Sequence, residues 1–235
     1  MLLLALDTSG TQVSVALHDG AAVVARIDVA DPRRHAEVLT PAIDGVLTRA
    51  GRRIDEVSDL AVGVGPGPFT GLRVGLVTAE VLGHVLGIAV HGVGSLDALA
   101  AAAVRDGTVG ADEDFWVATD ARRREVYWGR YRGTRRLDGP GVLAPADVPR
   151  GGLPVVGRGG LLYPDLLGPA VGPADVTAAD VAELAVAALT GPGTIGAQPS
   201  GAPAQSSRTV LLPVQPLYLR RPDAVEPGAR KRVLR

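Results

Sequence analysis

The first part of the chain alternates between apolar segments and short polar turns. An apolar run at 2–7 ends in a polar turn, and residues 12–18 then alternate apolar and polar side chains. Alternation with a period of two is typical of a half-buried β-strand. Asp19-Gly20 favours a two-residue hairpin turn, and residues 22–29 are expected to form the returning strand. The pattern therefore predicts three consecutive, antiparallel strands.

Helical spacing of apolar residues follows and predicts a helix at 35–50. Pro41 lies inside this segment, where proline favours a kink or a late helix start, and Gly51 follows as a candidate C-cap. Strands and helices then alternate, with Ser95 as the expected cap of the last helix. Strands are expected at 60–64 and 88–93, and helices at 72–86 and 95–105.

This order of elements predicts the fold class. Three meandering strands followed by alternating helices and strands, βββαβαβα, is the topology of the ribonuclease-H-like fold, which actin-like ATPases and sugar kinases use twice. We therefore predict an α/β, two-lobed actin-like ATPase fold, with a complete first lobe at 1–108 and a reduced second lobe at 109–190. Residues 191–235 are expected to form a Pro/Gly-rich linker and a C-terminal arm, of which 211–221 pack back on the body.

The second half carries a weaker pattern. Strands are expected at 115–119, 125–131 and 153–156, and a helix at 177–189. Thr177-Ala-Ala-Asp180 resembles a capping box at the start of that helix, with Asp in place of the usual Glu. These elements are too few for a full copy of the first lobe.

Composition narrows the functional classes. Of 235 residues, 46% are hydrophobic and 21% charged, which suits a sizeable core and excludes wholesale disorder. The 24 basic and 25 acidic residues give a net charge of -1, so the overall field does not favour nucleic acid, although local basic patches can. The chain has no cysteine and one lysine, Lys231. That excludes thiolate nucleophiles, Cys-type zinc sites, Schiff-base lysines and P-loops.

The N-terminal sequence does not resemble a secretory signal, because MLLLALD has no basic region before its apolar run. No uninterrupted apolar stretch approaches the roughly 18 residues of a membrane span. We therefore expect a soluble, cytoplasmic protein with no membrane partner.

The turn Asp7-Thr8-Ser9-Gly10 is the first candidate for binding chemistry. In actin-like ATPases the turn between the first two strands cradles a phosphate, and small residues expose backbone N–H groups to the anion. Asp, Ser and Gly are also the residues that an ordinary polar turn uses. Both interpretations stay open from the sequence.

The loop Gly65-Pro66-Gly67-Pro68-Phe69-Thr70-Gly71 is the second candidate. Its glycines and prolines fix a backbone path that leads into the N-terminus of a helix, where unpaired N–H groups face outward. It is either an anion or partner-contact site or a tight connection between a strand and a helix.

The helix after this loop carries a stripe of small residues. Gly75, Ala79 and Gly83 recur every four positions and share one face. Each glycine inside a helix costs roughly 1 kcal/mol relative to alanine, so we expect another backbone to approach this face. That backbone belongs either to the chain's own sheet or to a helix of another chain. The second interpretation predicts that Ala79→Arg breaks association and leaves the fold intact.

No histidine pattern indicates a metal. His18, His35, His84 and His91 include no pair at i,i+3 or i,i+4 spacing. An HxxxH or HExxH metallopeptidase motif is therefore missing. His35 is better explained as a helix-start or interface residue than as a ligand, and we expect no metal.

Several segments, in order along nearly the whole chain, resemble the TsaB (YeaZ) family. The run from Gly65 to Gly75 is the specific one. The supporting segments are 3–9, His35, 92–95, 120–122, 125–128, 156–157, 164–166 and 218–220.

The resemblance implies a non-catalytic partner protein. TsaB proteins are bacterial members of the actin-like ATPase superfamily that take part in making threonylcarbamoyladenosine at position 37 of tRNAs reading codons that begin with A. Their paralogue TsaD transfers the threonylcarbamoyl group, and TsaE is a small ATPase. TsaB dimerises with TsaD, or with itself, through helices of its N-terminal lobe. By this resemblance the chain is a pseudoenzyme that meets tRNA only through the complex.

The resemblance also implies where the partner binds. Together with the loop and the stripe described above, the expected interface comprises Leu39, Ile43, Leu47, Gly65, Pro66, Gly67, Phe69, Thr70, Gly71, Arg73, Gly75, Ala79 and Gly83. We expect no catalytic residue and no intrinsic cofactor, with ATP or ADP bound, if anywhere, at the joint surface with the TsaD partner. The alternative is a small ATP-dependent kinase or ATPase of the actin-like fold. Against it, Asp120 is followed by Ala121 and arginines instead of a second phosphate turn.

A basic segment begins after Asp120. It contains Arg122, Arg123, Arg124, Arg130, Arg132, Arg135 and Arg136, interleaved with Tyr127, Trp128 and Tyr131. Arginines beside aromatic rings, above all the first three, could hold the tRNA backbone in the assembled complex. The alternative is a solvated hairpin whose aromatic rings turn inward.

Overall fold

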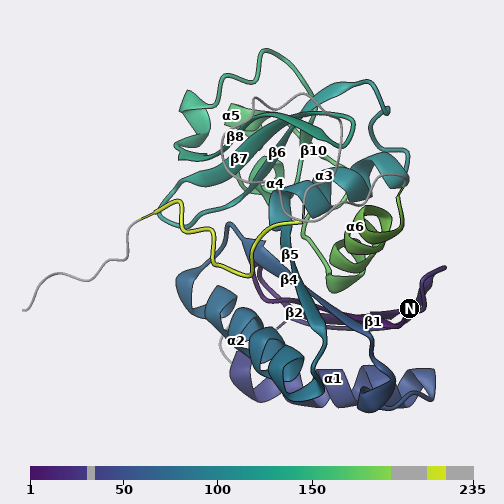
Figure 1. Cartoon of the computed structure of the whole chain (residues 1–235). Helices are drawn as coiled ribbons and strands as arrows, with labels where there is room; N and C mark the ends of the chain where they lie inside the picture. The colour runs from purple at the N-terminus through teal and green to yellow at the C-terminus, as the bar shows by residue number, and fades with distance from the viewer. Residues whose placement is uncertain (31–34, 192–210, 221–235) are drawn as a thin grey trace, which may run out of the picture.

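A computed structural model describes residues 1–30, 35–191 and 211–220. It has two lobes, each built on a five-stranded sheet (Figure 1), which is the two-lobed actin-like architecture expected from the sequence. The first lobe follows the predicted order βββαβαβα, with a short 3₁₀ helix inserted at Ile54–Glu56.

The first sheet has the strand order β3-β2-β1-β4-β5. Its strands are β1 (Leu3–Asp7), β2 (Val13–His18), β3 (Val23–Val29), β4 (Asp59–Gly65) and β5 (Ala89–Gly94). The central strand β1 pairs antiparallel with β2 and parallel with β4, and every one of its residues is buried. A strand covered on both faces needs a continuous apolar sequence, which explains the run at the N-terminus.

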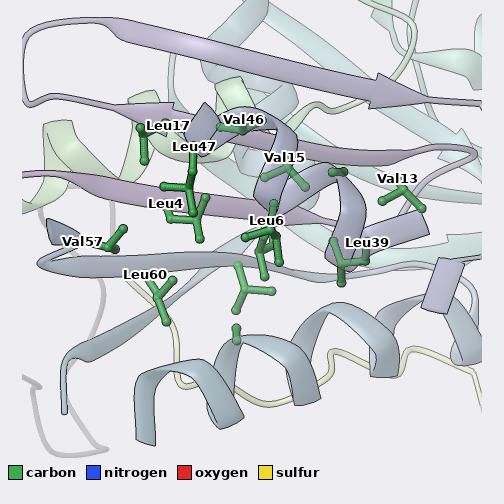
Figure 2. Packing of buried hydrophobic residues seen from close by; sticks show 14 of the residues in the cluster. Leu4, Leu6, Val13, Val15, Leu17, Leu39, Val46, Leu47, Val57 and Leu60 are labelled. Atoms are coloured by element: carbon green, nitrogen blue, oxygen red, sulfur yellow. The ribbon is translucent and has the colours of Figure 1, made fainter. Parts of the chain in front are cut away.

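Four helices cover the two faces of this sheet. They are α1 (His35–Ala50), α2 (Phe69–Leu86), α3 (Ser95–Arg105) and α6 (Ala178–Thr190). α1 and α2 lie side by side on one face, and α3 and α6 lie on the other (Figure 1). Figure 2 shows the apolar layer under the first pair, where Leu39 and Val46 of α1 meet Leu4, Leu6 and Val15 of the sheet. Burial of each such side chain contributes roughly 1.5–3 kcal/mol to folding.

The second sheet repeats the strand order of the first in reduced form, β8-β7-β6-β9-β10. Its elements are β6 (Asp114–Asp120), β7 (Val126–Arg132), β8 (Arg135–Leu143), β9 (Val155–Val156), α4 (Arg158–Leu162), α5 (Pro164–Leu167) and β10 (Ala170–Val171). β6, β7 and β9 confirm the three expected strands, whereas β8 and β10 were missed. β8 contains Gly139, Pro140 and Gly141, residue types that are depleted in strands, and its register with β7 is irregular.

Helix α6 follows the second lobe in sequence but covers the first sheet. Its predicted capping box is confirmed, because Thr177 Oγ1 accepts a hydrogen bond from Asp180 N–H at 3.3 Å and Asp180 Oδ2 accepts one from Thr177 N–H at 3.0 Å. Its side chains belong to the same buried cluster as Leu3, Ala5 and Ala16 of β1 and β2. The chain therefore returns to the first lobe at its last described helix.

Two local predictions need correction. The hairpin after β2 has a four-residue loop, 19–22, because strand pairing ends at His18 and Val23. Within the loop Asp19 N–H bonds to Ala22 O at 3.1 Å, and the Asp19 carboxylate accepts two further backbone N–H groups. Ser95 does not cap α3: Gly94 is the N-cap residue, and the Ser95 hydroxyl donates to Ser9 Oγ at 2.8 Å instead. The serine is used for a contact between strand ends.

The other helix ends agree more closely with the sequence. α1 begins at His35 and continues through Pro41, so there is no late start, and Gly51 adopts a φ of +62° just after it, as a C-cap glycine does. α2 begins at Phe69, three residues earlier than expected, with Pro68 as its N-cap residue.

α2 is the one helix, within the described ranges, that is long and apolar enough to cross a membrane by length and composition alone. Its 18 residues have a mean hydropathy of 1.3. Leu72, Leu76 and Ala79 are nevertheless buried in this chain's own core. A core helix of a soluble protein passes the same test, so the composition of α2 is weak evidence for a span.

Residues 211–220 form the predicted arm, drawn in yellow in Figure 1. Leu212 exchanges two backbone hydrogen bonds with Gly92 of β5, at 2.8 and 3.1 Å, and Leu217 N–H donates to Val64 O at 2.8 Å. Residues 192–210, where the linker is expected, and residues 221–235 lie outside the described residues.

Candidate partner interface and interlobe cleft

The turn after β1 is held together by its own side chains. Asp7 is fully buried, and its carboxylate accepts hydrogen bonds from Ser9 N–H and from the Ser9 hydroxyl at 3.0 Å. Burial raises the pKa of the Asp7 carboxyl from 3.8 to about 7, against the opposing effect of the Ser9 hydrogen bonds. The carboxylate points into the fold and away from solvent, above Gly63, where any side chain would collide with it.

A chain of hydroxyl groups extends from Asp7 across the strand ends. Ser95 Oγ donates to Ser9 Oγ at 2.8 Å and accepts from Gly65 N–H at 3.1 Å. β1, β4 and the start of α3 are thereby fixed to one another. The predicted phosphate turn at 7–10 thus uses its hydroxyls mainly to position the ends of these elements.

Thr8 faces the other way, toward α2. Its hydroxyl donates to Gly71 O at 2.8 Å and accepts from Gly75 N–H at 3.1 Å. The hydroxyl thereby bridges two backbone groups one turn apart on α2, the carbonyl of Gly71 and the N–H of Gly75.

A cleft of about 440 Å³, counting its open mouth, lies between the lobes. The first lobe lines it with Ser9, Gly10, Thr11, Pro66, Pro68 and Ser95, and the second part of the chain with Thr119, Asp120, Arg122, Arg158, Asp175 and Val176. Its charges neutralise each other, because Arg158 donates to Asp175 at 2.8 Å and Arg122 lies 3.2 Å from Asp120. With Asp7 turned inward and both arginines paired, these residues do not fit a nucleotide held by this chain alone.

The loop 65–71 is a close-packed connection over most of its length. Gly65, Pro66, Gly67 and Gly71 are buried. A side chain on Gly67 would run into Ser9 O, and Gly65 adopts a φ of +93°. The glycines are required because this loop and the turn after β1 touch.

The expectation that the small-residue stripe faces another chain is wrong. Gly75, Ala79 and Gly83 are buried against the chain's own body. A Cβ at Gly75 would lie 2.5 Å from Thr8 Oγ1, one at Gly83 would collide with Val90, and Ala79 is 0% exposed. The close approach is real, but side chains of the same chain make it, Thr8 at Gly75 and Val90 at Gly83.

The α1 part of the expected interface is also wrong. Leu39, Ile43 and Leu47 are at most 7% exposed and belong to the core between α1 and the sheet. Amphipathic spacing marked the inner face of α1, which the sheet covers. Together with the buried residues of loop 65–71, they are unavailable to a partner unless the fold rearranges.

Three members of the expected interface do lie on the surface: Phe69, Thr70 and Arg73. They begin an exposed face of α2 that continues through Val77, Val81 and Val85. These valines are 55%, 55% and 72% exposed. We call Phe69, Arg73, Val77, Val81 and Val85 the α2 outer face.

The valines of this face were missed from the sequence. Their signal is present, since they recur every four positions on the side of the helix opposite the glycine stripe. Both stripes are apolar or small, and spacing alone did not tell which one the sheet covers.

An aromatic cluster stands at the N-terminal end of the α2 outer face. Tyr218 of the arm stacks on Phe69 with ring centroids 4.9 Å apart, and the Arg73 guanidinium lies 3.9 Å from the centre of the Phe69 ring. Arg73 Nε also donates to Tyr218 Oη at 3.1 Å. Exposed aromatic and arginine side chains of this kind are enriched where proteins bind one another.

The arginines of the basic segment after β6 fall into two groups, those of strands β7 and β8 and those of the turn between β6 and β7. Arg130 and Arg132 bind Asp114 at 2.7 and 2.5 Å, and Arg136 binds Asp97 at 2.9 Å. Tyr127 and Tyr131 are buried. The inward-turned hairpin therefore describes most of this segment, but Arg122, Arg123 and Arg124 are exposed in the turn between β6 and β7.

Among the described residues, no group of three or more His, Asp or Glu side chains is arranged to hold a metal ion. His18 lies 3.7 Å from Glu183 and His91 lies 3.2 Å from Asp59, at separate places on the first lobe. In the part of the chain that the structure describes, neither pair has a third His, Asp or Glu side chain placed to complete a metal site.

Comparison with known families matches residues 29–147 to the family model described as TsaD: tRNA N6-adenosine threonylcarbamoyltransferase. An uncharacterized protein of Mycobacterium tuberculosis is 38% identical over 234 residues, covering 94% of this chain and 92% of that protein.

Two relatives carry a functional name. The tRNA threonylcarbamoyladenosine biosynthesis protein TsaB of Escherichia coli is 36% identical over 132 residues, covering 56% of this chain and 55% of that protein. TsaB of Bacillus subtilis is 32% identical over 133 residues, covering 56% of each chain. The chain thus matches just over half the length of these TsaB relatives.

Two solved structures from Pseudomonas aeruginosa share the fold. One, described as an uncharacterized protein with similarity to peptidase YEAZ, has a TM-score of 0.73 and 30% identity, covering 93% of this chain and 99% of that one. The other, YeaZ, has a TM-score of 0.65 and 32% identity, covering 80% and 92%. With a shared fold over nearly the full length and TsaB relatives above 30% identity, the chain belongs to the TsaB (YeaZ) family.

Proposed function

We propose that this chain is a non-catalytic partner of a TsaD-like subunit, needed to form threonylcarbamoyladenosine at position 37 of tRNAs that read codons beginning with A. The names of the TsaB relatives support a role in making this nucleoside. In the proposal the chain works in the cytoplasm, as a heterodimer with the TsaD-like subunit and together with a TsaE-like ATPase. When alone it forms a homodimer.

The α2 outer face is the observation that carries this proposal. Val77, Val81 and Val85 form an exposed apolar row along one helix, and Phe69 and Arg73 extend it. Scattered exposed valines are ordinary, but a continuous apolar row with an aromatic and arginine cluster at one end is typical of a surface that binds protein. We propose that this face, and not the buried stripe on the opposite side of α2, binds the TsaD-like subunit.

The cleft supports a non-catalytic role. Its two arginines are already paired with carboxylates, and the Asp7 carboxylate is buried beneath the turn. Phosphoryl transfer needs charged groups positioned on both sides of the phosphates. Any ATP or ADP at the joint surface would therefore depend on groups that the partner supplies.

Association tests the interface directly. Val81→Arg puts a charge into the middle of the α2 outer face and is expected to abolish binding to the TsaD-like subunit in sedimentation velocity. Val24 of β3 is 44% exposed on another element, so Val24→Arg is the matched control and should bind normally. Normal binding by Val81→Arg would remove α2 from the interface.

Reconstitution tests the role. The TsaD and TsaE counterparts, the adenylate-forming enzyme, ATP, threonine, bicarbonate and tRNA are combined with and without this chain, and the modified nucleoside is quantified by mass spectrometry. We expect modification to collapse without the chain or with Val81→Arg, and to persist with Val24→Arg. Full modification without the chain, or ATP turnover by the chain alone, favours the actin-like ATPase or kinase alternative.

A further inference from the structure

The turn between β6 and β7 has an unusual backbone. Arg122, Arg123 and Arg124 are consecutive and have φ values of 62°, 53° and 60°. They are the only non-glycine residues with positive φ among those the structure describes. Residues with a Cβ rarely adopt this left-handed conformation, and then mostly as single residues such as Asn or Asp. We call residues 122–124 the arginine turn.

The surrounding contacts hold the arginine turn in this conformation. Asp120 Oδ1 accepts from Arg122 N–H at 2.7 Å, and Ala121 and Glu125 close the turn with backbone hydrogen bonds, including Ala121 N–H to Glu125 O at 3.0 Å. Arg220 of the arm braces it from outside by donating to Ala121 O at 3.3 Å and pairing with Glu125. Strained backbone persists where neighbours over-determine it, and such strain gathers at functional sites.

Arginine is a costly choice for this backbone. Glycine or asparagine would adopt the same φ at lower cost, so the fold gives no reason for three arginines here. All three side chains are exposed, with the Arg122 guanidinium paired to Asp120, on a chain whose net charge is -1. A cluster of arginines on a rigid turn is suited to binding a polyanion, because each arginine can contact one phosphate group.

The arginine turn lies next to the proposed partner face. Arg122 and Pro68 line the same cleft, and Pro68 immediately precedes Phe69 at the start of α2. The arm connects the two places, because Tyr218 stacks on Phe69 and Arg220 braces the turn. A subunit bound at the start of α2 would therefore lie near the arginine turn.

We infer that the arginine turn contacts the phosphate backbone of tRNA bound to the complex with the TsaD-like subunit. This inference rests on the proposed function. Because Tyr127 and Tyr131 are buried, these two neighbouring rings are not available to stack on bases. The contact is with phosphates, so it adds affinity and positions the RNA without reading its sequence.

The experiment uses the double variant Arg123→Asn/Arg124→Asn in the full chain, bound to the TsaD-like subunit. The affinity for an unmodified tRNA that reads codons beginning with A is measured by fluorescence anisotropy over a range of salt concentrations. We expect the slope of log K against log salt to fall by roughly 0.7–0.9 per arginine removed. The melting temperature of the chain is expected to rise by a few degrees, since asparagine relieves the left-handed backbone.

Two further variants serve as controls. Arg135→Asn removes an exposed arginine at the opposite end of β7 and is expected to leave the slope unchanged. Arg123→Lys/Arg124→Lys keeps the charge on the strained backbone and should retain most of the affinity without the gain in melting temperature.

The outcomes separate this inference from the proposed function. Association of the two protein chains is measured first without RNA, and its absence in the unaltered protein would overturn both. If the chains associate but Arg123→Asn/Arg124→Asn leaves the tRNA affinity and salt slope unchanged, or if Arg135→Asn reduces them equally, the arginine turn does not bind RNA. If the double variant loses its protein partner instead, the turn belongs to the protein interface and the inference is wrong.

Discussion

Thr8 and Gly75 fit together so closely that no side chain can be added between them. The Thr8 hydroxyl accepts the Gly75 N–H hydrogen bond at 3.1 Å, and a Cβ on Gly75 would lie 2.5 Å from that oxygen. The turn after β1 and the first turns of α2 are therefore one unit, although 67 positions separate the two residues.

Gly75→Ala is the test of this unit. In an exposed helix the change would stabilise the protein by roughly 1 kcal/mol. Here we expect a loss of about 1–3 kcal/mol in the free energy of unfolding, because Thr8 is held by two hydrogen bonds and cannot move aside without losing them. Urea denaturation measures the change.

The double variant Thr8→Ala/Gly75→Ala provides the control for Gly75→Ala. Removing the hydroxyl removes the clash, so the two changes together should cost less than the sum of the single changes, by roughly 1–2 kcal/mol. Additive costs, or a Gly75→Ala protein as stable as the original, would show that the close approach does not constrain α2.

Ala79→Arg and Val81→Arg should differ strongly in their effect on the free energy of unfolding, although the residues are only two positions apart. Ala79 is 0% exposed, so an arginine there would have to enter the core, and we expect loss of several kcal/mol or failure to fold. Val81 is 55% exposed, and its substitution should change the free energy of unfolding by less than about 0.5 kcal/mol. Thermal melts followed by circular dichroism compare the two. A well-folded Ala79→Arg protein would contradict the assigned faces of α2.

These two residues also show what the sequence could and could not predict. Spacing correctly grouped Gly75, Ala79 and Gly83 on one closely packed face, although the side chains of Thr8 and Val90, and not another backbone, make the nearest contacts. Helical periodicity alone cannot tell which side of α2 is buried, since the helix carries small residues on one side and valines on another. Only the position of the sheet decides which side is buried.

Burial and separation along the chain also explain which other features could be predicted from the sequence and which could not. The continuous apolar run of β1 fits a strand covered on both faces, whereas β2, expected to be half-buried from its alternation, is buried along its whole length, including Ser14 and His18. The conformation of the turn at 122–124 could not be predicted, because three successive arginines give no sequence signal for positive φ. The contact between Tyr218 and Phe69 joins residues from opposite ends of the chain, which local patterns cannot reveal.

Asp7 predicts an unusual dependence of stability on pH. Its pKa is about 7 in the folded protein, because of burial, and near its ordinary value of 3.8 in the unfolded chain. Between these values the folded state holds a proton that the unfolded state has released, so rising pH favours unfolding. This group alone should lower the free energy of unfolding progressively from about pH 4 to pH 7, by a total of the order of 3–4 kcal/mol.

Asp7→Asn isolates this effect. Asparagine does not titrate, so the variant should gain stability relative to the original protein as the pH rises from 5 to 7, measured by urea denaturation at each pH. Asp19→Asn is the control: hydrogen bonds from Ala22 and Ala21 lower the pKa of this exposed carboxyl, so it is ionised throughout that range and its removal should leave the slope unchanged. Parallel pH curves for Asp7→Asn and the original protein would mean that Asp7 is not held protonated.

Tyr218 is expected to hold the arm in place at one end. Stacked aromatic pairs contribute roughly 0.5–1.5 kcal/mol beyond the area they bury, so Tyr218→Ala should open the arm locally and speed hydrogen exchange at the Leu217 amide by about 2- to 10-fold. That amide donates to Val64 O, next to the lost contact.

Two comparisons make the Tyr218 prediction specific. The Leu212 amide is held independently by Gly92 at the other end of the arm, so its exchange should change little. Tyr218→Phe keeps the stack on Phe69 and loses only the hydrogen bond from Arg73, so its effect should be the smaller of the two. Equal exchange rates at Leu217 in all three proteins would show that backbone hydrogen bonds alone fix the arm. Because Arg220 follows two residues later and braces the arginine turn, loosening at Tyr218 should also weaken that brace.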